Sequence, residues 1–300
     1  MNNTNGTTSD TQDGFVEYEF RNNPQIAKEI QSAAASNKCL DLLNGNTANY
    51  TTIQLYRCTG RSPQQWIFDG RQIRLAKDPT KCVNLKGGNM KASTDIQLRD
   101  CYDKARQDWI YDGFSGAFRS GKNPKHCMNL KDGDILDDTN VQIAACDDGS
   151  TQQWLMEGVT LVDNTSGVKT IHLASDTDMC LDLYNGDTDN STSQVQLYQC
   201  TGRSPQQWVF DDLRIKYNAK QEKCLNLDAG DTSNGTKIKV RDCYDKDRQV
   251  WFYDGISRSF RSAINPDKCL QVKDQATTND TPVVLYDCDG SDAQQWVIEG

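Results

Sequence analysis

The sequence predicts an all-β protein made of two tandem domains, each built from three copies of one short repeat. Three observations support this. Cysteines recur in evenly spaced pairs, a Gln-x-Trp motif follows every pair, and the segments between them alternate apolar and polar residues as half-buried strands do. No segment keeps a helical pattern once the repeats are aligned.

The repeat is defined by its cysteines, its tryptophans and its glutamines. The twelve cysteines form six pairs that are 19 residues apart, or 20 in the fourth pair: Cys39/Cys58, Cys82/Cys101, Cys127/Cys146, Cys180/Cys200, Cys224/Cys243 and Cys269/Cys288. A Trp stands eight residues after each second Cys: Trp66, Trp109, Trp154, Trp208, Trp251 and Trp296. A Gln precedes each Trp by two positions: Gln64, Gln107, Gln152, Gln206, Gln249 and Gln294. We expect these Trp and Gln side chains to pack the core and the hairpins.

The repeats group as three plus three. The first cysteines of the third and fourth repeats are 53 residues apart instead of about 44, and the two halves match at an offset of 141 to 142. We therefore predict an N-terminal tail or linker over residues 1–29, a first domain over 30–158, a linker over 159–168 and a second domain over 169–300.

Each repeat is predicted to contain about four short strands. The first holds an apolar residue nine positions before the first Cys, and it includes Ile30 although residues 24–35 have helical propensity. The second and third are residues 39–42 and 53–58 in the first repeat, joined by the polar loop 44–52. The fourth begins at the Trp and ends in a turn.

The cysteine pattern indicates an oxidising compartment. An even number of cysteines, all at repeat positions, favours disulfides, whereas zinc would need close Cys-x-x-Cys pairs and histidines. No run could span a membrane and no apolar signal segment opens the chain, so we expect a secreted protein in mature or fragment form. Seven glycosylation sequons are compatible with secretion: Asn2, Asn5, Asn49, Asn164, Asn190, Asn234 and Asn279.

The composition argues against several functions. A formal net charge of −9 and a pI near 4.8 disfavour nucleic acid as a partner. No dense acidic loop predicts a calcium site, and no cofactor is indicated. His126 and His172 replace basic residues of other repeats and are expected on the surface, so nucleophilic catalysis has no candidate residues and we predict a non-enzyme. Oligomeric state is left open.

Strand alternation predicts one polar cluster in each domain. Asp41 and Cys39 share one face of their strand, and Gln54, Tyr56 and Cys58 share one face of the next. A disulfide between the two cysteines would bring these faces together. A carboxylate acceptor, an amide and an aromatic ring suit a sugar, because the ring can stack on its C–H face. The fourth repeat carries the same set as Asp182, Gln196 and Tyr198.

The phased Cys, Gln and Trp positions resemble the ricin-type β-trefoil family, which includes the ricin B-chain and family 13 carbohydrate-binding modules. The resemblance covers residues 30–300. It implies two β-trefoil domains of three pseudo-threefold repeats with one disulfide per repeat, and a galactose site at Asp41, Gln54, Tyr56 and Gln64, with Gln206 matching Gln64. One departure is Pro63 and Pro205, where the family often has an Asn ligand; Asn44 and Asn185 are the candidate substitutes.

An alternative is that the two aspartates only stabilise turns and the tyrosines are ordinary strand residues. The other four repeats show that the fold does not require either. At the Asp, Gln and aromatic positions they carry Asn84/Gln97/Arg99, Asn129/Gln142/Ala144, Asn226/Lys239/Arg241 and Gln271/Val284/Tyr286. We therefore predict sugar sites in the first and fourth repeats, with the sixth as the one doubtful case.

The sequence thus predicts a secreted, non-catalytic protein that binds saccharides through one site per domain. Two alternatives stay open. The chain could be the targeting region of a larger glycosidase or toxin, or it could be a protein-interaction or inhibitor trefoil that binds no sugar, because fold alone does not determine function.

Overall fold

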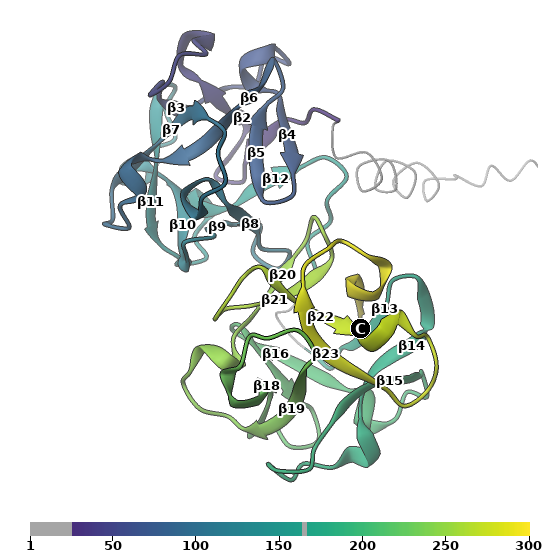
Figure 1. Ribbon diagram of the computed structural model, residues 1–300. Helices are drawn as coiled ribbons and strands as arrows, with labels where there is room; N and C mark the ends of the chain where they lie inside the picture. The colour runs from purple at the N-terminus through teal and green to yellow at the C-terminus, as the bar shows by residue number, and fades with distance from the viewer. Residues whose placement is uncertain (1–25, 164–166) are drawn as a thin grey trace, which may run out of the picture. The chain divides into compact units, whose positions relative to one another are not determined.

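The computed structural model describes residues 26–163 and 167–300, and the chain divides into two compact units between Thr160 and Leu161. Each unit is a 12-stranded antiparallel sheet, and no α-helix occurs in the described residues (Figure 1). The predicted all-β class is confirmed. Most of the predicted tail, including Asn2 and Asn5, lies outside the described residues, as do Asn164 and part of the predicted linker.

The first domain repeats a four-strand unit three times. Its strands are β1 (Ile30–Ser32), β2 (Ala35–Leu42), β3 (Ile53–Arg57), β4 (Trp66–Asp69), β5 (Gln72–Leu75), β6 (Asp78–Leu85), β7 (Thr94–Asp100), β8 (Trp109–Tyr111), β9 (Phe118–Ser120), β10 (Asn123–Leu130), β11 (Thr139–Ala145) and β12 (Trp154–Met156). The fourth strand of each repeat pairs with the first strand of the next, and β12 returns to β1. The second and third strands form a hairpin, and β11 contacts both β3 and β7. This threefold arrangement is a β-trefoil.

The second domain has the same order of strands. They are β13 (Thr170–Leu173), β14 (Asp176–Leu183), β15 (Val195–Gln199), β16 (Trp208–Asp211), β17 (Arg214–Tyr217), β18 (Lys223–Leu227), β19 (Thr236–Asp242), β20 (Trp251–Asp254), β21 (Ser259–Ser262), β22 (Lys268–Val272), β23 (Thr281–Asp287) and β24 (Trp296–Glu299). β24 closes on β13, and β23 pairs with both β15 and β19. The repeat phase placed Ile30 and its five equivalents on strands, and each begins or lies within a first strand.

Twelve short 3₁₀ turns complete the repeats: η1 (Leu43–Gly45), η2 (Ser62–Gln64), η3 (Lys86–Gly88), η4 (Ala105–Gln107), η5 (Lys131–Gly133), η6 (Ser150–Gln152), η7 (Tyr184–Gly186), η8 (Ser204–Gln206), η9 (Asp228–Gly230), η10 (Asp247–Gln249), η11 (Lys273–Gln275) and η12 (Asp292–Gln294). The odd-numbered turns follow the second strand of each repeat. Their middle residue has a positive φ, which Asn44 (55°) and Asn185 (51°) tolerate better than most residues do.

The six tryptophans lie in the two domain cores with at most 4% of their surface exposed. Each indole N–H donates to the carbonyl oxygen of the residue after the first Cys of its own repeat, as Trp66 does to Leu40 at 3.0 Å. The ring therefore fills the core while its polar atom is satisfied. The same hydrogen bond forms in the fourth repeat, although its two cysteines are 20 residues apart instead of 19.

The glutamine of each Gln-x-Trp braces the turn after the second Cys. In the first repeat its Oε1 accepts from the backbone N–H of Thr59 at 2.7 Å, and its Nε2 donates to the carbonyl of Arg57 at 2.8 Å. The predicted role of these glutamines in hairpin packing is thus a set of hydrogen bonds to the backbone.

All twelve cysteines are paired as predicted, and no free cysteine remains in the described part of the chain. The disulfides are Cys39–Cys58, Cys82–Cys101, Cys127–Cys146, Cys180–Cys200, Cys224–Cys243 and Cys269–Cys288. They link the second strand of each repeat to the end of its third strand. Several disulfides in a chain of this size are typical of extracellular proteins.

The second cysteine of each pair lies just outside the third strand, whereas the sequence predicted it inside that strand. The third strand was expected to include it, as in the range 53–58, but every third strand ends one residue earlier. The strand ends there because the backbone N–H after the cysteine bonds to the Gln-x-Trp glutamine and not to another strand. The first cysteine of each pair is buried, whereas the second is partly exposed: Cys58, Cys101, Cys146, Cys200, Cys243 and Cys288.

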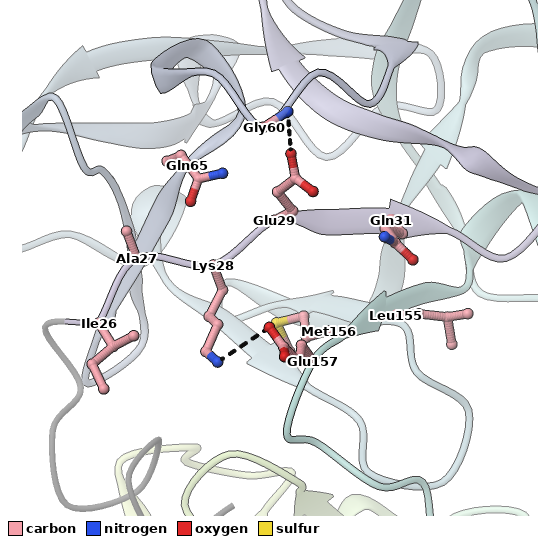
Figure 2. Close-up of a pocket in the computed structure, with 10 residues that line it drawn as sticks. All are labelled: Ile26, Ala27, Lys28, Glu29, Gln31, Gly60, Gln65, Leu155, Met156 and Glu157. Carbon is pink, nitrogen blue, oxygen red and sulfur yellow. Dashed lines mark hydrogen bonds and ion pairs between the residues drawn. The ribbon is translucent and has the colours of Figure 1, made fainter. Parts of the chain in front are cut away.

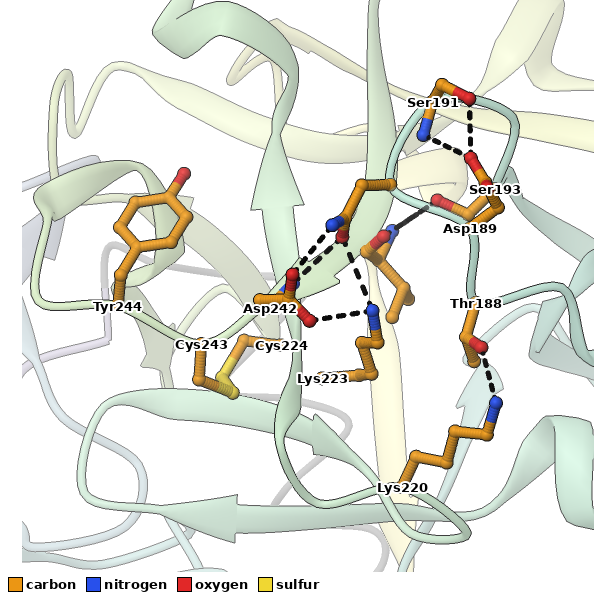
Figure 3. Close-up of polar contacts among 12 residues, drawn as sticks. Thr188, Asp189, Ser191, Ser193, Lys220, Lys223, Cys224, Asp242, Cys243 and Tyr244 are labelled. Carbon is orange, nitrogen blue, oxygen red and sulfur yellow. Dashed lines mark hydrogen bonds and ion pairs between the residues drawn. A yellow bond between two sulfur atoms is a disulfide. The ribbon is translucent and has the colours of Figure 1, made fainter.

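Asparagine side chains connect neighbouring repeats. Asn190 in the fourth repeat donates to the carboxylate of Asp242 at 2.7 Å and accepts from its backbone N–H at 3.0 Å. Lys223 forms an ion pair with Asp242 at 2.7 Å (Figure 3). Asn49 and Asn234 make equivalent contacts with the following repeat. We call each of these an asparagine clamp. These sequon asparagines are therefore structural links in the folded domains.

One expectation about the histidines was wrong. His172 is 9% exposed and not a surface residue, because its ring packs beside the disulfide of the fourth repeat. Its Nδ1 lies 2.7 Å from the carbonyl oxygen of Thr177, and its Nε2 lies 2.8 Å from the hydroxyl of Thr170. Both ring nitrogens are therefore within hydrogen-bond distance of neighbouring protein groups. Comparison with the lysines and arginines of other repeats could not reveal these contacts.

Candidate functional site

Strands β2 and β3 bring the predicted residues of the first repeat together. Asp41 lies directly opposite Gln54 in the antiparallel register, and Cys39 lies opposite Tyr56. The amide nitrogen of Gln54 donates to the Asp41 carboxylate at 3.0 Å. Asp41 is in the body of a strand and accepts no backbone N–H within the described structure, so it does not stabilise a turn.

These side chains line an open cavity of about 390 Å³. Its walls include Asp41, Gln54 and Tyr56 from the hairpin, and Asn44 from the turn that follows β2. Tyr56 is half-buried and lines the cavity, and the Arg57 guanidinium lies 5.7 Å from the centroid of its ring. The remaining walls come from the segment before the Gln-x-Trp and from the third repeat: Thr59, Arg61, Pro63, Gln64 and Asp138.

Gln64 and Asn44 differ in what they can offer a ligand. Gln64 is fully buried, and its amide already bonds the backbone on both sides of the Cys58 turn. It therefore positions the wall of the cavity. Asn44 is exposed, and its side-chain amide has no hydrogen-bond partner in the described residues. Of the two amides, only Asn44 has donors and acceptors left for a bound molecule.

Pro63 replaces the family's Asn and shapes the cavity wall instead. It lies in the first turn of η2, where a missing N–H costs nothing. A Cβ added to Gly45 would approach the Pro63 ring to 3.1 Å, so the glycine lets the two loops meet closely, and its φ of 61° favours glycine as well. The loops around Asn44 and Pro63 are thus fitted to each other.

The second domain reproduces the cluster. Asp182 lies opposite Gln196 on β14 and β15, and the Gln196 amide nitrogen donates to its carboxylate at 2.8 Å. Tyr198 is half-buried, and Asn185 occupies the same left-handed turn position as Asn44. Gln206 braces Thr201 and Gln199 as Gln64 braces its own turn. The Oε1 atom of Gln196 is buried and accepts no hydrogen bond from the described residues.

Burial raises the pKa of the Asp41 and Asp182 carboxyls above the usual aspartate value of 3.8. Desolvation is the largest cause. Hydrogen bonds from the two glutamines of each repeat lower the pKa in part, and a carboxylate of a neighbouring repeat, Asp138 or Asp280, raises it further. Each cluster therefore holds a desolvated carboxylate that accepts hydrogen bonds from two glutamine side chains.

The equivalent position is closed in the second and fifth repeats. There the residue after the second Cys is a tyrosine whose hydroxyl donates to the strand asparagine: Tyr102 to Asn84 and Tyr244 to Asn226, both at 2.5 Å. An arginine packs over each tyrosine ring, 4.8 Å from the centroid in one repeat and 5.1 Å in the other. In the first and fourth repeats this residue is threonine, Thr59 or Thr201, so no tyrosine hydroxyl bonds the carboxylate. Asp41 lines the cavity although it is only 7% exposed.

In the third and sixth repeats, the equivalent strand side chain is bonded by a Thr or Gln side chain of its own repeat. The side-chain Oδ1 of Asn129 accepts from the hydroxyl of Thr151 at 3.0 Å, and Oε1 of Gln271 accepts from Nε2 of Gln294 at 2.7 Å. The sixth repeat keeps Tyr286, which is 39% exposed, but its strand amide is used by the protein. Among the described repeats, the two with aspartate are those that combine a polar strand residue with remaining capacity for a ligand.

The sequence reasoning missed two features of the cavity. Threonine at position 59 is a small residue where the second and fifth repeats carry a tyrosine, and comparison of the six repeats at this position could have found it. Asp138 comes from the third repeat and reaches the first because β11 pairs with β3. No local pattern carries that information, because it depends on which repeats are neighbours in space.

A larger cavity of about 750 Å³ lies elsewhere in the first domain (Figure 2). Its charged groups are already paired: Lys28 with Glu157 at 3.6 Å, and Glu29 with the backbone N–H of Gly60 at 2.9 Å. Leu155 and Met156 form an apolar part of the wall. It offers fewer uncommitted polar groups than the cavity at Asp41 and is a weaker candidate for a polar ligand.

Two clusters have the spacing of metal ligands, but neither has the chemistry. Each combines one residue, His172 or Glu29, with two cysteines of a disulfide. A thiolate is the metal-binding form of cysteine, and a disulfide sulfur is not a thiolate. These clusters therefore provide no metal site.

A sequence model of the ricin-type β-trefoil lectin domain matches residues 27–157 and 169–296, once for each domain. The chain belongs to this family. Its two ricin-type domains keep the repeat framework, and the first and fourth repeats keep the aspartate and the aromatic residue together. No curated protein sequence matches the chain significantly.

Solved structures similar to this ricin-type chain have low sequence identity. A mosquitocidal holotoxin is 19% identical, with 91% of this chain and 34% of that chain covered and a TM-score of 0.40. The agglutinin of Abrus precatorius is 18% identical, with 91% and 96% covered and a TM-score of 0.39. The C-half of an earthworm R-type lectin, in complex with GalNAc, is 15% identical, with 44% and 98% covered and a TM-score of 0.38. The chain spans about a third of the holotoxin.

No helix in the described residues is long and apolar enough to cross a membrane.

Proposed function

We propose that the protein is a secreted, non-catalytic lectin that binds galactose-type sugars at one site in each domain. The observation that carries the proposal is the desolvated carboxylate of Asp41, and of Asp182 in the second domain, held beside a glutamine and a half-buried tyrosine. A carboxylate can accept from two adjacent hydroxyls, and the tyrosine ring can pack on the C–H face of the sugar. Membership of a lectin family supports carbohydrate as the ligand class.

Each residue has a proposed role. Asp41 and Asp182 accept sugar hydroxyls, Gln54 and Gln196 orient the carboxylate, and Tyr56 and Tyr198 stack on the ring. Asn44 and Asn185 replace the amide lost at Pro63 and Pro205. Gln64 and Gln206 hold the wall without contacting the ligand, because their amides are used by the backbone.

The test is calorimetric titration with galactose of the full chain and of the Asp41→Asn/Asp182→Asn variant. A hydrogen bond to a charged group contributes about 1.5–3 kcal/mol, so we expect the dissociation constant to rise roughly tenfold to hundredfold. The matched control is Asp69→Asn/Asp211→Asn, which makes the same change in the same two repeats, at strand ends outside the cavity. Equal affinity in the site variant and the control would reject the assignment.

A second variant tests the same site through shape alone. Thr59→Tyr/Thr201→Tyr introduces the residue that the second and fifth repeats already carry at this position, so the fold should accept it. We expect the tyrosine to cover the carboxylate and to abolish binding at unchanged thermal stability. An absence of sugar binding by the unaltered chain would instead favour a protein-interaction role.

The chain is also compatible with serving as the sugar-targeting part of a larger secreted enzyme or toxin. A catalytic or pore-forming domain in the same gene would establish that role, and the two proposed sites would be unaffected by it.

A further inference from the structure

The cavity at Asp41 contains a second carboxylate that belongs to another repeat. Asp138 stands at the end of the third-repeat loop, immediately before β11. Its backbone N–H donates to the carbonyl oxygen of Leu55 at 2.9 Å, and the next residue pairs with Leu55 across the sheet. The carboxylate is exposed and lines the cavity together with Asp41. Its place is therefore fixed by strand pairing between repeats.

The second domain has the same arrangement. Asp280 precedes β23, where Thr281 pairs with Leu197 and Pro282 pairs with Gln196 of the site. The charge of Asp280 acts on Asp182 as that of Asp138 acts on Asp41. The Oε1 atom of Gln196 in this second cluster is buried and accepts no hydrogen bond from the described residues.

The six repeats provide an internal comparison. The residue eight positions before the second Cys is Tyr50, Ser93, Asp138, Thr192, Gly235 and Asp280 in the six repeats. Aspartate occurs at this position only in the third and sixth repeats. These are the repeats whose third strands pair with β3 and β15 of the two candidate sites. The second carboxylate thus accompanies the first, although the two come from different repeats.

We propose that Asp138 and Asp280 are specificity-determining residues that make each site select neutral and amino sugars over acidic sugars. This inference rests on the proposed function. Among the described residues, the only cation that lines the first cavity is Arg61, so two carboxylates face one guanidinium there. A protonated amino group on the ligand is attracted by this negative excess, and the carboxylate of a uronic acid is repelled.

The test compares galactose, galactosamine and galacturonic acid as ligands of the full chain and of Asp138→Asn/Asp280→Asn. Titration at about pH 6.5 keeps a sugar amine protonated. Because Asp138 is exposed, each charge effect should be about two- to fivefold. Relative to galactose, we expect the variant to bind galacturonic acid more tightly and galactosamine more weakly, each by about that factor. Asparagine tolerates the φ of 68° at position 138, so the loop should keep its shape.

The control is Asp132→Asn/Asp274→Asn. Like the test variant, it removes one negative charge from each of the same two loops. Asp132 and Asp274 have left-handed backbone conformations and do not line the cavity at Asp41. The inference would be overturned if the affinities for galacturonic acid and galactosamine, each relative to galactose, were the same in Asp138→Asn/Asp280→Asn as in the control. Galactose binding itself would still support the proposed function. Failure of the unaltered chain to bind any of the three sugars would overturn the proposed function as well, so the two failures are distinguishable.

Discussion

At the residue scale, the two repeats proposed to bind sugar differ from the closed second and fifth repeats at two positions. One is the strand residue, Asp41 or Asn84, and the other is the residue after the second Cys, Thr59 or Tyr102. The first position could be predicted from the sequence, because strand alternation and the cysteine pair define which side chains share a face. The second is visible when the six repeats are aligned, but the sequence does not show that the tyrosine hydroxyl reaches the strand asparagine.

Acidification should weaken sugar binding at a higher pH than an ordinary aspartate would allow. The pKa of Asp41 and Asp182 is raised above 3.8, chiefly by desolvation, so these carboxyls take up protons earlier as the pH falls. A protonated carboxyl loses acceptor capacity, and the affinity for galactose falls with it. Titrations from neutral to acidic pH should show a midpoint above 3.8.

Acidification has the opposite effect on the stability contribution of these two aspartates. Each folded domain binds the proton of its aspartate more readily than the unfolded chain does, so this contribution favours folding as the pH falls through the raised pKa. Loss of binding above pH 3.8 therefore does not come from unfolding through these residues. Denaturant unfolding measured beside the titrations checks this, and a binding midpoint at or below 3.8 would contradict the assignment of the acceptor.

At the element scale, hairpins of neighbouring repeats are held together by the asparagine clamps as well as by strand pairing. Asp242 has a lowered pKa because Lys223 and Asn190 bond its carboxylate, and Asp100 and Asp287 have the same surroundings in their repeats. The sequence showed Asn49, Asn190 and Asn234 only as sequons. Their contacts cross a repeat boundary over about 50 positions, so no local pattern predicts them.

Removal of one clamp should destabilise one domain. Asn190→Ala deletes a hydrogen bond to the Asp242 carboxylate and another to its backbone N–H, at a partly exposed place where water can replace part of both. We expect the free energy of unfolding of the second domain to fall by about 1 kcal/mol. Galactose binding by the folded variant should not change. The second repeat carries Ala92 at the equivalent position, so Ala92→Asn is a control in which no clamp is lost. Equal stability of Asn190→Ala and the unaltered chain would show that the clamp contributes nothing.

At the scale of the whole molecule, most of the fold could be predicted because the same pattern of Cys, Gln and Trp positions occurs in six repeats. The twelve cysteines, the Gln-x-Trp motifs and the gap of 53 residues determine the disulfides, the core and the grouping into three plus three. The repeat pattern does not show which repeats contact each other in space. The position of Asp138 in the cavity of the first repeat depends on the pairing of β11 with β3, so it could be found only in the structure.

Two sites in one chain should act together on a surface that carries many sugars. Either single variant, Asp41→Asn or Asp182→Asn, should bind free galactose with half the stoichiometry and unchanged affinity at the remaining site. On a galactose-coated surface, linkage of two sites can raise the apparent affinity about a hundredfold or more, so each single variant should dissociate much faster than the unaltered chain. Surface plasmon resonance measures this. Equal dissociation rates would mean that the two sites do not engage one surface simultaneously.

The tyrosines in the second and fifth repeats allow a repeat to fold stably without a ligand site. Tyr102 and Tyr244 satisfy the strand asparagine from within the protein, so a repeat without a ligand has no unpaired buried amide. In evolutionary terms, a duplicated repeat can lose its ligand at little cost to the domain and remain as scaffold. The number of binding sites can then change among descendants of one ancestral repeat while the architecture stays the same.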